Sequence, residues 1–285
     1  MNQSIRAGSL ILVSFVLIAG WAVFFLGPLR GEVAVTIFDT SGARRAEYLS
    51  LSPFGVRLVQ SENPDVLAAV PAALGARVAR IVRTRDESLL VVQDGSVSVP
   101  ILSTPGALGT PQWSRDGRSI AFTAQTPEGS WRVSRAVPQG DRLDVGEGFR
   151  AYPSATQRTV ALTEKGIALL SYADTPPVVV VESPTPVPVT TPFAVSSDGT
   201  RVAWIAPADR SLQVFAYDKG FFVPILLKPA VDAQSIVFSP DGTYLLIARG
   251  GVERTELELM TIRNGALRPV SEQSGFVELH AWRYE

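Results

Sequence analysis

Short apolar runs follow a polar turn at three places in the chain, and the same residue types recur each time. Each ten-residue copy places an apolar residue and a serine before Asp-Gly, and three consecutive apolar residues at its end; the copies are 113–122, 195–204 and 238–247. Asp-Gly between apolar runs is a strong β-hairpin signal, because glycine adopts positive φ without strain. The pattern therefore predicts antiparallel strand pairs with turns at Asp116, Gly117, Asp198, Gly199, Asp241 and Gly242.

The intervals between these turns give the period of the repeat. Asp198 and Asp241 lie 43 residues apart, whereas Asp116 and Asp198 lie 82 apart, which leaves room for a degenerate copy. Residues 153–162 supply that copy: Val160-Ala161-Leu162 occupy the apolar frame, and Thr156-Gln157 replace Asp-Gly. A weaker match lies at 84–91. A period of about 40 residues built from strands is typical of four-stranded β-propeller blades.

These copies resemble the WD-type repeats of the TolB-like β-propellers, whose blades carry a Trp/Phe-Ser-Pro-Asp-Gly pattern followed by an apolar run. The copy at 238–247 matches this pattern nearly in full, and the copies at 113–122 and 195–204 match all of it but the proline. The resemblance covers about 84–285 and is specific to the blade rather than to one protein. It implies an exported, closed ring of antiparallel sheets that contacts proteins or envelope components, and it implies no catalytic residues.

We expect an all-β propeller at 30–285 with about six four-stranded blades, five to seven being compatible with the period. A ring of sheets usually closes by building one blade from both chain ends, which removes exposed edges. The apolar segment at about 278–284 is therefore expected to pair with sheet formed by about 33–52. Large side chains at repeat-linked positions are expected to fill the space between sheets, namely Trp113, Phe122, Trp204, Phe238 and Trp282.

Three segments fit the repeat less clearly. Residues 63–77 have helical composition and are expected to form a short excursion or a poorly formed blade. Residues 175–192 hold six prolines, and an outer strand with its loop is favoured there over a linker between domains, because edge strands tolerate proline. Residues 220–227 are apolar but too short to span a bilayer, so a buried strand is expected.

An uncharged stretch of 23 residues, 7–29, lies between Arg6 and Arg30. A helix of this length spans about 34 Å, enough to cross a hydrocarbon core of about 30 Å. We expect a transmembrane helix here, after a short cytoplasmic tail at 1–6, with the propeller outside the cytoplasm. A cleaved signal peptide is the alternative, although the apolar core is long for one and Leu26-Gly27-Pro28 is a poor cleavage context.

Composition and charge exclude several kinds of site. The formal net charge of -1 argues against a nucleic-acid partner, and the absence of cysteine excludes disulfides and thiol chemistry. A single histidine, His280, excludes a multi-histidine metal site and is expected to be a packing or surface residue. The three turn aspartates are expected to cap their own turns tens of ångströms apart around the ring, rather than to converge on calcium. No catalytic, metal or cofactor-binding residue is therefore expected, and no cofactor.

These features predict a non-enzymatic protein of a bacterial cell membrane, single-pass, with a periplasmic or cell-surface propeller that binds another envelope protein. Trp131 and the cluster Tyr217, Phe221 and Phe222 are candidates to face that partner, although core packing is the default for aromatic residues. The alternative is a propeller that senses a ligand or glycan, or an enzyme with its site in the central channel. An inward-facing cluster of acids, arginines or tyrosines would favour this alternative, and none is found at repeat spacing.

Overall fold

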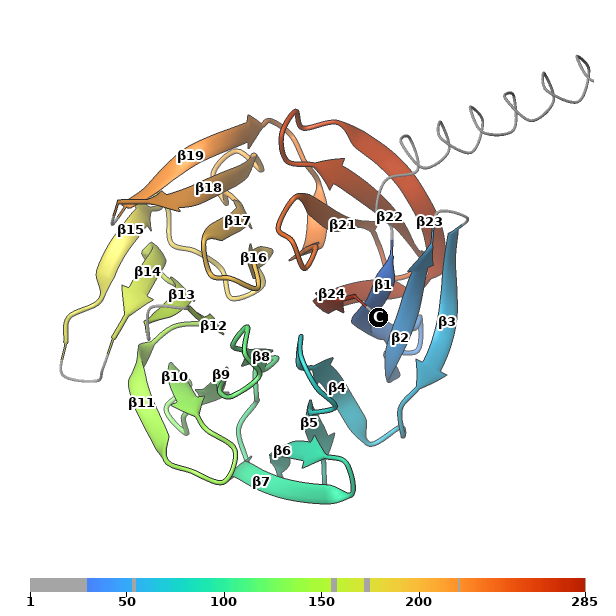
Figure 1. Ribbon diagram of the computed structural model, residues 1–285, viewed down its shortest axis with the longest axis vertical. Coiled ribbons are helices and arrows are strands. Elements are labelled where there is room, and N and C mark those ends of the chain that lie inside the picture. The colour runs from blue at the N-terminus through green and yellow to red at the C-terminus, as the bar shows by residue number, and fades with distance from the viewer. Residues whose placement is uncertain (1–29, 53–54, 155–157, 172–174, 220, 285) are drawn as a thin grey trace, which may run out of the picture.

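The computed structural model describes residues 30–52, 55–154, 158–171, 175–219 and 221–284. The tail expected at 1–6 and the transmembrane helix expected at 7–29 lie outside these ranges. Within them, no helix has the length and apolar character needed to cross a bilayer. The described chain forms six four-stranded antiparallel sheets arranged around a central axis, as the sequence predicted (Figure 1).

Each blade is a sheet whose strands follow one another from the axis to the rim, in the orders β24-β1-β2-β3, β4 to β7, β8 to β11, β12 to β15, β16 to β19 and β20 to β23. We number these blades 1 to 6. The strands are β1 Gly31–Phe38, β2 Arg44–Ser52, β3 Gly55–Ser61, β4 Val66–Pro71, β5 Val78–Arg83, β6 Ser88–Asp94, β7 Val97–Thr104, β8 Gln112–Trp113, β9 Ile120–Gln125, β10 Trp131–Ala136, β11 Arg142–Glu147, β12 Arg150–Pro153, β13 Thr159–Thr163, β14 Gly166–Leu170, β15 Val178–Glu182, β16 Phe193–Val195, β17 Arg201–Ile205, β18 Leu212–Asp218, β19 Phe221–Lys228, β20 Ala233–Phe238, β21 Tyr244–Gly250, β22 Arg254–Thr261, β23 Leu267–Ser274 and β24 Phe276–Arg283.

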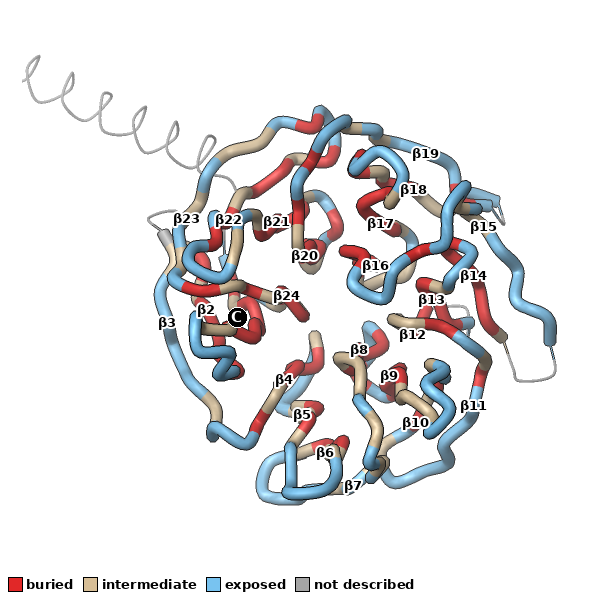
Figure 2. Tube along the Cα trace, turned by 180° about the vertical axis from the view of Figure 1, so that it is seen from behind, coloured by how far each residue is buried: buried red, intermediate tan, exposed pale blue. Residues whose placement is uncertain are grey.

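The core lies between neighbouring blades, where the inner strands are buried and the outermost strands are largely exposed (Figure 2). Six apolar clusters each join two adjacent sheets, so that every blade packs against both of its neighbours. The five residues expected in the blade core, Trp113, Phe122, Trp204, Phe238 and Trp282, are all buried in these clusters. Face-to-face packing of twisted sheets thus stabilises the ring.

Blade 1 is built from both ends of the described chain. β24 supplies its innermost strand and pairs antiparallel with β1, so that Ala34 lies opposite Ala281. The carbonyl of Arg30 accepts a hydrogen bond of 3.0 Å from the indole of Trp282. Gly31 has a φ of 111°, and a Cβ at this position would overlap the carbonyl oxygen of Arg283, so glycine is needed where the two ends meet.

The Asp-Gly turns hold their shape through a serine that precedes each aspartate. In blade 6 the hydroxyl of Ser239 donates to Asp241 at 2.6 Å and accepts from the backbone N–H of Tyr244 at 3.0 Å. The hydrogen bond from Ser114, together with the backbone N–H of Arg118, holds the pKa of Asp116 below its ordinary value. The turn aspartates therefore act within their own turns.

Turns of adjacent blades are closer together than the sequence suggested. The hydroxyl of Ser197, in the turn of blade 5, donates to the carbonyl of Pro240, in the turn of blade 6, at 2.8 Å. The guanidinium of Arg201 also donates to the carbonyl of Gly242. The expectation of turns separated by tens of ångströms is wrong for this pair, because the turns follow the innermost strands and so gather close to the axis.

The structure shows what is formed by the three segments that fitted the repeat less clearly. The short excursion or poorly formed blade expected at 63–77 is wrong, since Val66–Pro71 is β4, the innermost strand of a complete four-stranded blade. An innermost strand buried on both faces shows a continuous apolar run, which resembles a helix in composition. The proline-rich segment contains β15, an outermost strand, and its loop, as favoured. A strand does form at the segment expected at 220–227, but the expected burial is wrong. Phe222 is the one buried residue of β19 and five of its eight residues are exposed, because the strand forms the outer edge of blade 5.

The ring has two faces, which we name by what they carry. The innermost strands all run in one direction along the axis. The turn face lies at their carboxyl ends and carries the Asp-Gly turns, together with loop 72–77 of blade 2. The open face lies at their amino ends and carries loops such as 62–65, 126–130 and 206–211.

Candidate functional site

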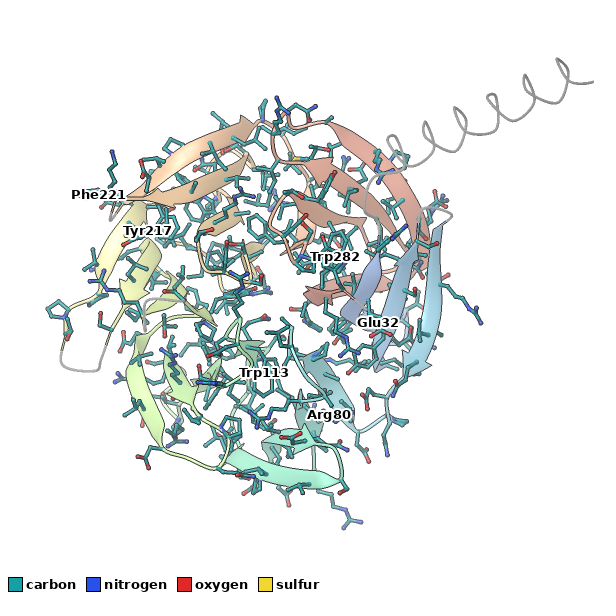
Figure 3. The ribbon with its side chains drawn as sticks, in the orientation of Figure 1. Glu32, Arg80, Trp113, Tyr217, Phe221 and Trp282 are labelled. Atoms are coloured by element: carbon teal, nitrogen blue, oxygen red, sulfur yellow. The ribbon has the colours of Figure 1, made fainter. Side chains whose placement is uncertain are left out.

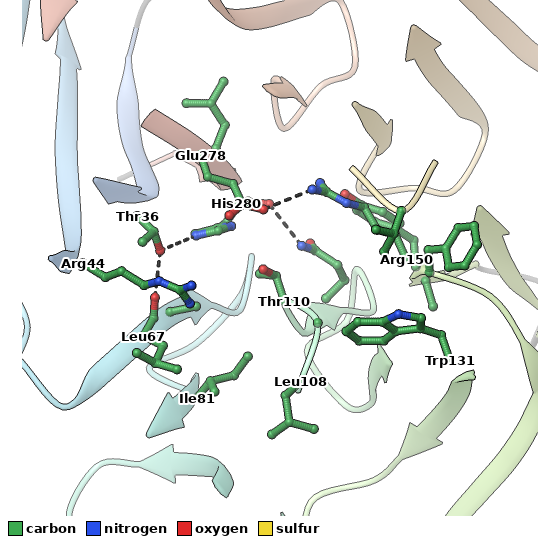
Figure 4. Close-up of a pocket in the computed structure, with 18 of the residues that line it drawn as sticks. Thr36, Arg44, Leu67, Ile81, Leu108, Thr110, Trp131, Arg150, Glu278 and His280 are labelled. Atoms are coloured by element: carbon green, nitrogen blue, oxygen red, sulfur yellow. Dashed lines mark hydrogen bonds and ion pairs between the residues drawn. The ribbon is translucent and has the colours of Figure 1, made fainter. Parts of the chain in front are cut away.

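The central channel is divided by side chains into two hollows. The hollow on the open face has a volume of about 170 Å³, and the one on the turn face about 60 Å³. Gln112, Tyr152 and His280, from three different innermost strands, line both hollows and so form the waist between them. The wider hollow is shown in Figure 4.

An ion pair crosses the open-face hollow. Arg150 begins β12 in blade 4, and Glu278 lies in β24 of blade 1, on the opposite side of the ring. Their nearest side-chain atoms, Nη2 and Oε1, are 3.1 Å apart, and both side chains are about one-quarter exposed (Figure 4). The pair therefore links opposite blades, and each charge is already compensated by the other.

His280 acts as a fixed hydrogen-bond donor. The hydroxyl of Thr36 donates to the carbonyl of Leu67 at 2.9 Å, so its oxygen accepts from Nε2 of His280, 2.7 Å away (Figure 4). This geometry places the imidazole proton on Nε2. Burial lowers the pKa of His280 below its ordinary value of 6.5 and keeps the ring neutral. The sequence-based expectation of a packing histidine agrees with this position, 4% exposed.

Tyr152 completes the waist. Its hydroxyl donates to the carbonyl of Phe193 at 3.2 Å, and the two rings pack edge to face with centroids 5.5 Å apart. Burial raises the pKa of Tyr152 to about 12, so the phenol remains a neutral donor. Gln112 donates to the carbonyl of His280 at 3.3 Å. The polar groups of the waist are thus engaged with one another or with the backbone.

A pH dependence of stability follows from the burial of His280. Below about pH 6.5 the unfolded chain binds a proton that the folded ring excludes, so the free energy of unfolding should fall as the pH falls from 6.5 toward the folded pKa. The slope contributed by this one group approaches about 1.4 kcal/mol per pH unit. Denaturant unfolding at pH 7.5, 6.5 and 5.5 should show this decline, and His280→Gln should flatten it. An equal slope in both proteins would contradict the burial of a neutral imidazole.

A larger pocket lies between blades 3 and 4, at the open-face loops 148–149 and 164–165, and extends to Thr175 and Pro177 near the turn face. It has a volume of about 450 Å³ and an apolar floor formed by Val145, Ala168, Leu170 and Val179. The cluster joining these two blades contains four alanines among its seven members, namely Ala121, Ala151, Ala161 and Ala168. At closely packed interfaces larger side chains fill the space between the sheets, whereas alanine side chains leave part of that space empty. The pocket is of a size that accepts a ligand or the side chains of a partner.

Trp131 and Phe149 stand between this pocket and the channel hollow, and both line each of them. The two cavities are thus neighbours that share these two aromatic side chains, and we call the pair of cavities the groove. Trp113, Trp204 and Trp282 donate their indole N–H groups to protein acceptors, whereas Trp131 donates to none of the residues that the structure describes. Trp131 is half-buried and keeps a free donor at the groove.

The second aromatic candidate divides between core and surface. Tyr217 and Phe222 pack edge to face, with ring centroids 5.3 Å apart, in the cluster between blades 4 and 5. Phe221 is 73% exposed at the outer rim (Figure 3). Of the aromatic residues that the sequence offered as candidates to face a partner, Trp131 is the one that lines the open-face hollow.

The inward-facing cluster of charged and polar residues that the sequence analysis did not find is present in the channel, and by the criterion given there it favours the ligand-sensing alternative. Arg150 and Tyr152 alternate along β12, and Glu278 and His280 alternate along β24, so each pair points to the axis. Polar residues two positions apart in an innermost strand are the sequence signal that would have identified these four side chains. A search for the same residue type once per repeat could not identify them, because each blade contributes different residues to the channel. Within the described ranges, no three His, Asp or Glu side chains are placed to hold a metal ion.

Comparison with known proteins supports the fold. No family model and no curated protein matches the chain. Among solved structures, TolB from Acinetobacter baumannii superposes with a TM-score of 0.70 at 17% identity, covering 91% of this chain and 68% of that one. A chain of a nidogen/laminin complex gives a TM-score of 0.56 at 10% identity, covering 88% of this chain and 98% of that one. An oligogalacturonate lyase in complex with manganese gives 0.55 at 11%, covering 85% and 86%.

At these identities the similarity establishes the fold and no activity. The chain is a six-bladed β-propeller structurally similar to TolB, which confirms that part of the resemblance seen in the repeats. The similar structures include an enzyme and a complex between two proteins. Function must therefore be argued from the groove of this chain.

Proposed function

We propose that the protein is a membrane-anchored, extracytoplasmic propeller that binds another envelope protein through its open face, without catalysis. The segment 7–29 would be the anchor, because it is uncharged and long enough to cross a bilayer. The anchor confines the ring to a surface and raises its concentration near membrane partners.

The groove at Trp131 carries the binding part of the proposal. Aromatic side chains at the edge of an apolar pocket are typical anchors of protein interfaces, where a few buried groups supply most of the affinity. The free indole N–H can donate to a partner's backbone. The groups that could perform acid-base work, Glu278 and His280, are already paired with Arg150 and Thr36. These pairings favour binding over catalysis.

A ligand-sensing propeller is the second candidate, and the charge around the pocket favours it. Arg132, Lys165, Glu147 and Glu164 line the pocket and balance one another in sign. A neutral ring-shaped ligand such as a sugar, stacked on Trp131 and hydrogen-bonded at its edge, would suit these surroundings.

Site-specific photo-crosslinking in native membranes tests the proposal. A photoreactive amino acid at position 130, an exposed residue that lines the pocket beside Trp131, should form a discrete protein adduct, and Trp131→Ala in the same chain should weaken that adduct. The matched control carries the photoreactive residue at Leu58, which is 50% exposed on the outer strand of blade 1. The same adduct from position 58, or no protein adduct together with a rise in melting temperature on adding oligosaccharide, would replace protein binding with the ligand-sensing function.

A further inference from the structure

The described chain starts at the turn face. Arg30 is held there by the indole of Trp282, and Gly31 opens β1 beside Arg283, at the carboxyl end of β24. The uncharged segment 7–29 ends immediately before Arg30. If that segment is in a bilayer, no spacer separates the membrane from this face, so the turn face is the one brought against the lipid.

The two faces differ in charge. The described loops of the open face contain ten acidic residues and three basic ones, Arg85, Lys165 and Arg210. Arg30 and the described loops of the turn face contribute seven basic residues against four acidic ones, Asp116, Asp141, Asp198 and Asp241. Three of these four aspartates are engaged within their own turns. The chain as a whole is nearly neutral, so this difference is a polarity between faces.

Exposed apolar side chains also gather at the turn face. Leu74, Val97, Val137, Val178 and Phe221 are 50 to 73% exposed, and they lie at this end of four consecutive blades, 2 to 5. The open-face end of the ring exposes fewer large apolar side chains among the described residues, namely Val189, Leu227 and Val252. Apolar residues interspersed with arginine and lysine are the composition of surfaces that lie at a membrane interface.

We propose that the turn face rests on the surface of an anionic bilayer. This inference depends on the anchoring part of the proposed function and adds the orientation of the ring to it. The apolar hairpin tips reach the headgroup region, and the excess of basic residues is attracted to anionic lipid within about a Debye length. The excess of basic residues on the turn face determines that this face is attracted to the lipid. The position of Arg30 on the same face places the end of the segment 7–29 there as well.

The orientation has a consequence for partner binding. In blade 3, which carries Trp131, the strands β9, β10 and β11 have six residues each, which corresponds to about 20 Å between the two faces. The groove at Trp131 therefore points away from the lipid and stays accessible to a partner. The acidic loops around it face the aqueous phase.

Fluorescence quenching in nanodiscs tests this orientation with the full chain. The protein has no cysteine, so each introduced cysteine carries a unique label. Ser96→Cys places a fluorophore on an exposed hairpin of the turn face, and Ser130→Cys places it on an exposed loop of the open face. In nanodiscs of phosphatidylcholine and phosphatidylglycerol containing spin-labelled lipid, the label at 96 should be quenched and the label at 130 should not. Arg115→Glu with Arg118→Glu should lower quenching at 96 toward the level at 130.

The outcomes separate the two proposals. Protein that co-purifies with nanodiscs but is quenched equally at both positions, or more strongly at 130, overturns the orientation and leaves the anchor standing. Protein that does not co-purify with nanodiscs overturns the anchor, and the orientation with it. Quenching at 96 that persists unchanged in pure phosphatidylcholine would exclude the electrostatic part of the attraction.

Discussion

Removal of the last eight residues, 278–285, should abolish the cooperatively folded ring. The deletion takes away most of β24, the innermost strand of blade 1, and leaves the inner edge of β1 unpaired. It also removes Leu279 and Trp282 from the cluster between blades 6 and 1. Loss of a buried leucine or tryptophan side chain costs about 2–5 kcal/mol each, and domains are stable by only about 5–15 kcal/mol.

Near-ultraviolet circular dichroism and a thermal melt would measure this effect. The truncated chain should show no sharp transition. The matched control lacks only residues 284 and 285, beyond the end of β24, and should melt close to the intact protein. Unchanged melting of the eight-residue deletion would show that β24 does not close the ring.

Trp204→Ala should lower the free energy of unfolding by about 3–5 kcal/mol. Trp204 is 2% exposed in β17, lies in the cluster between blades 4 and 5, and donates its indole N–H to Gln213 at 3.1 Å. Its removal leaves a cavity that the rigid sheets on either side cannot close.

Trp131→Ala is the matched control, because the same atoms are removed from a half-buried position at the groove. That change should cost about 1 kcal/mol or less, since it leaves no enclosed cavity. Denaturant unfolding of both variants gives the two values. Equal losses would mean that Trp131 belongs to the core, and the groove would then lose its proposed anchor.

The repeat made the fold predictable from the sequence. Asp-Gly turns such as Asp198-Gly199 mark the step from the innermost strand to the next strand, so their spacing counts blades directly. The helical composition of 63–77 was misleading because β4 is covered on both faces. A strand in that position needs no alternating polar residues, so its sequence lacks the usual pattern of a strand. The apolar sequence of β19 misled in the opposite sense, because an outermost strand can be apolar while most of its residues are exposed to solvent.

The site was less predictable, for a geometric reason. Arg150 and Glu278 are 128 residues apart, and nothing in either strand alone indicates that the two side chains meet across the axis. The pocket between blades 3 and 4 adjoins a cluster of small residues, such as Ala161 and Ala168, which are indistinguishable from ordinary core residues in the sequence. The small size of the side chains at this one of the six interfaces between blades becomes apparent only when the blades are assembled.

Ring closure by β24 is the feature on which the channel, the groove and both faces depend, and a disulfide tests it directly. Ala34 and Ala281 are opposite one another in β1 and β24, so cysteines at both positions should form an internal disulfide in the full chain upon mild oxidation. The control pair, Ala46→Cys with Ala281→Cys, places one cysteine in β2, two strands from β24 and about 10 Å away, beyond disulfide reach. Mass spectrometry should find the disulfide in the first pair and free thiols in the second. Free thiols in the first pair, or equal bridging in both, would show that the two ends of the chain do not form one sheet.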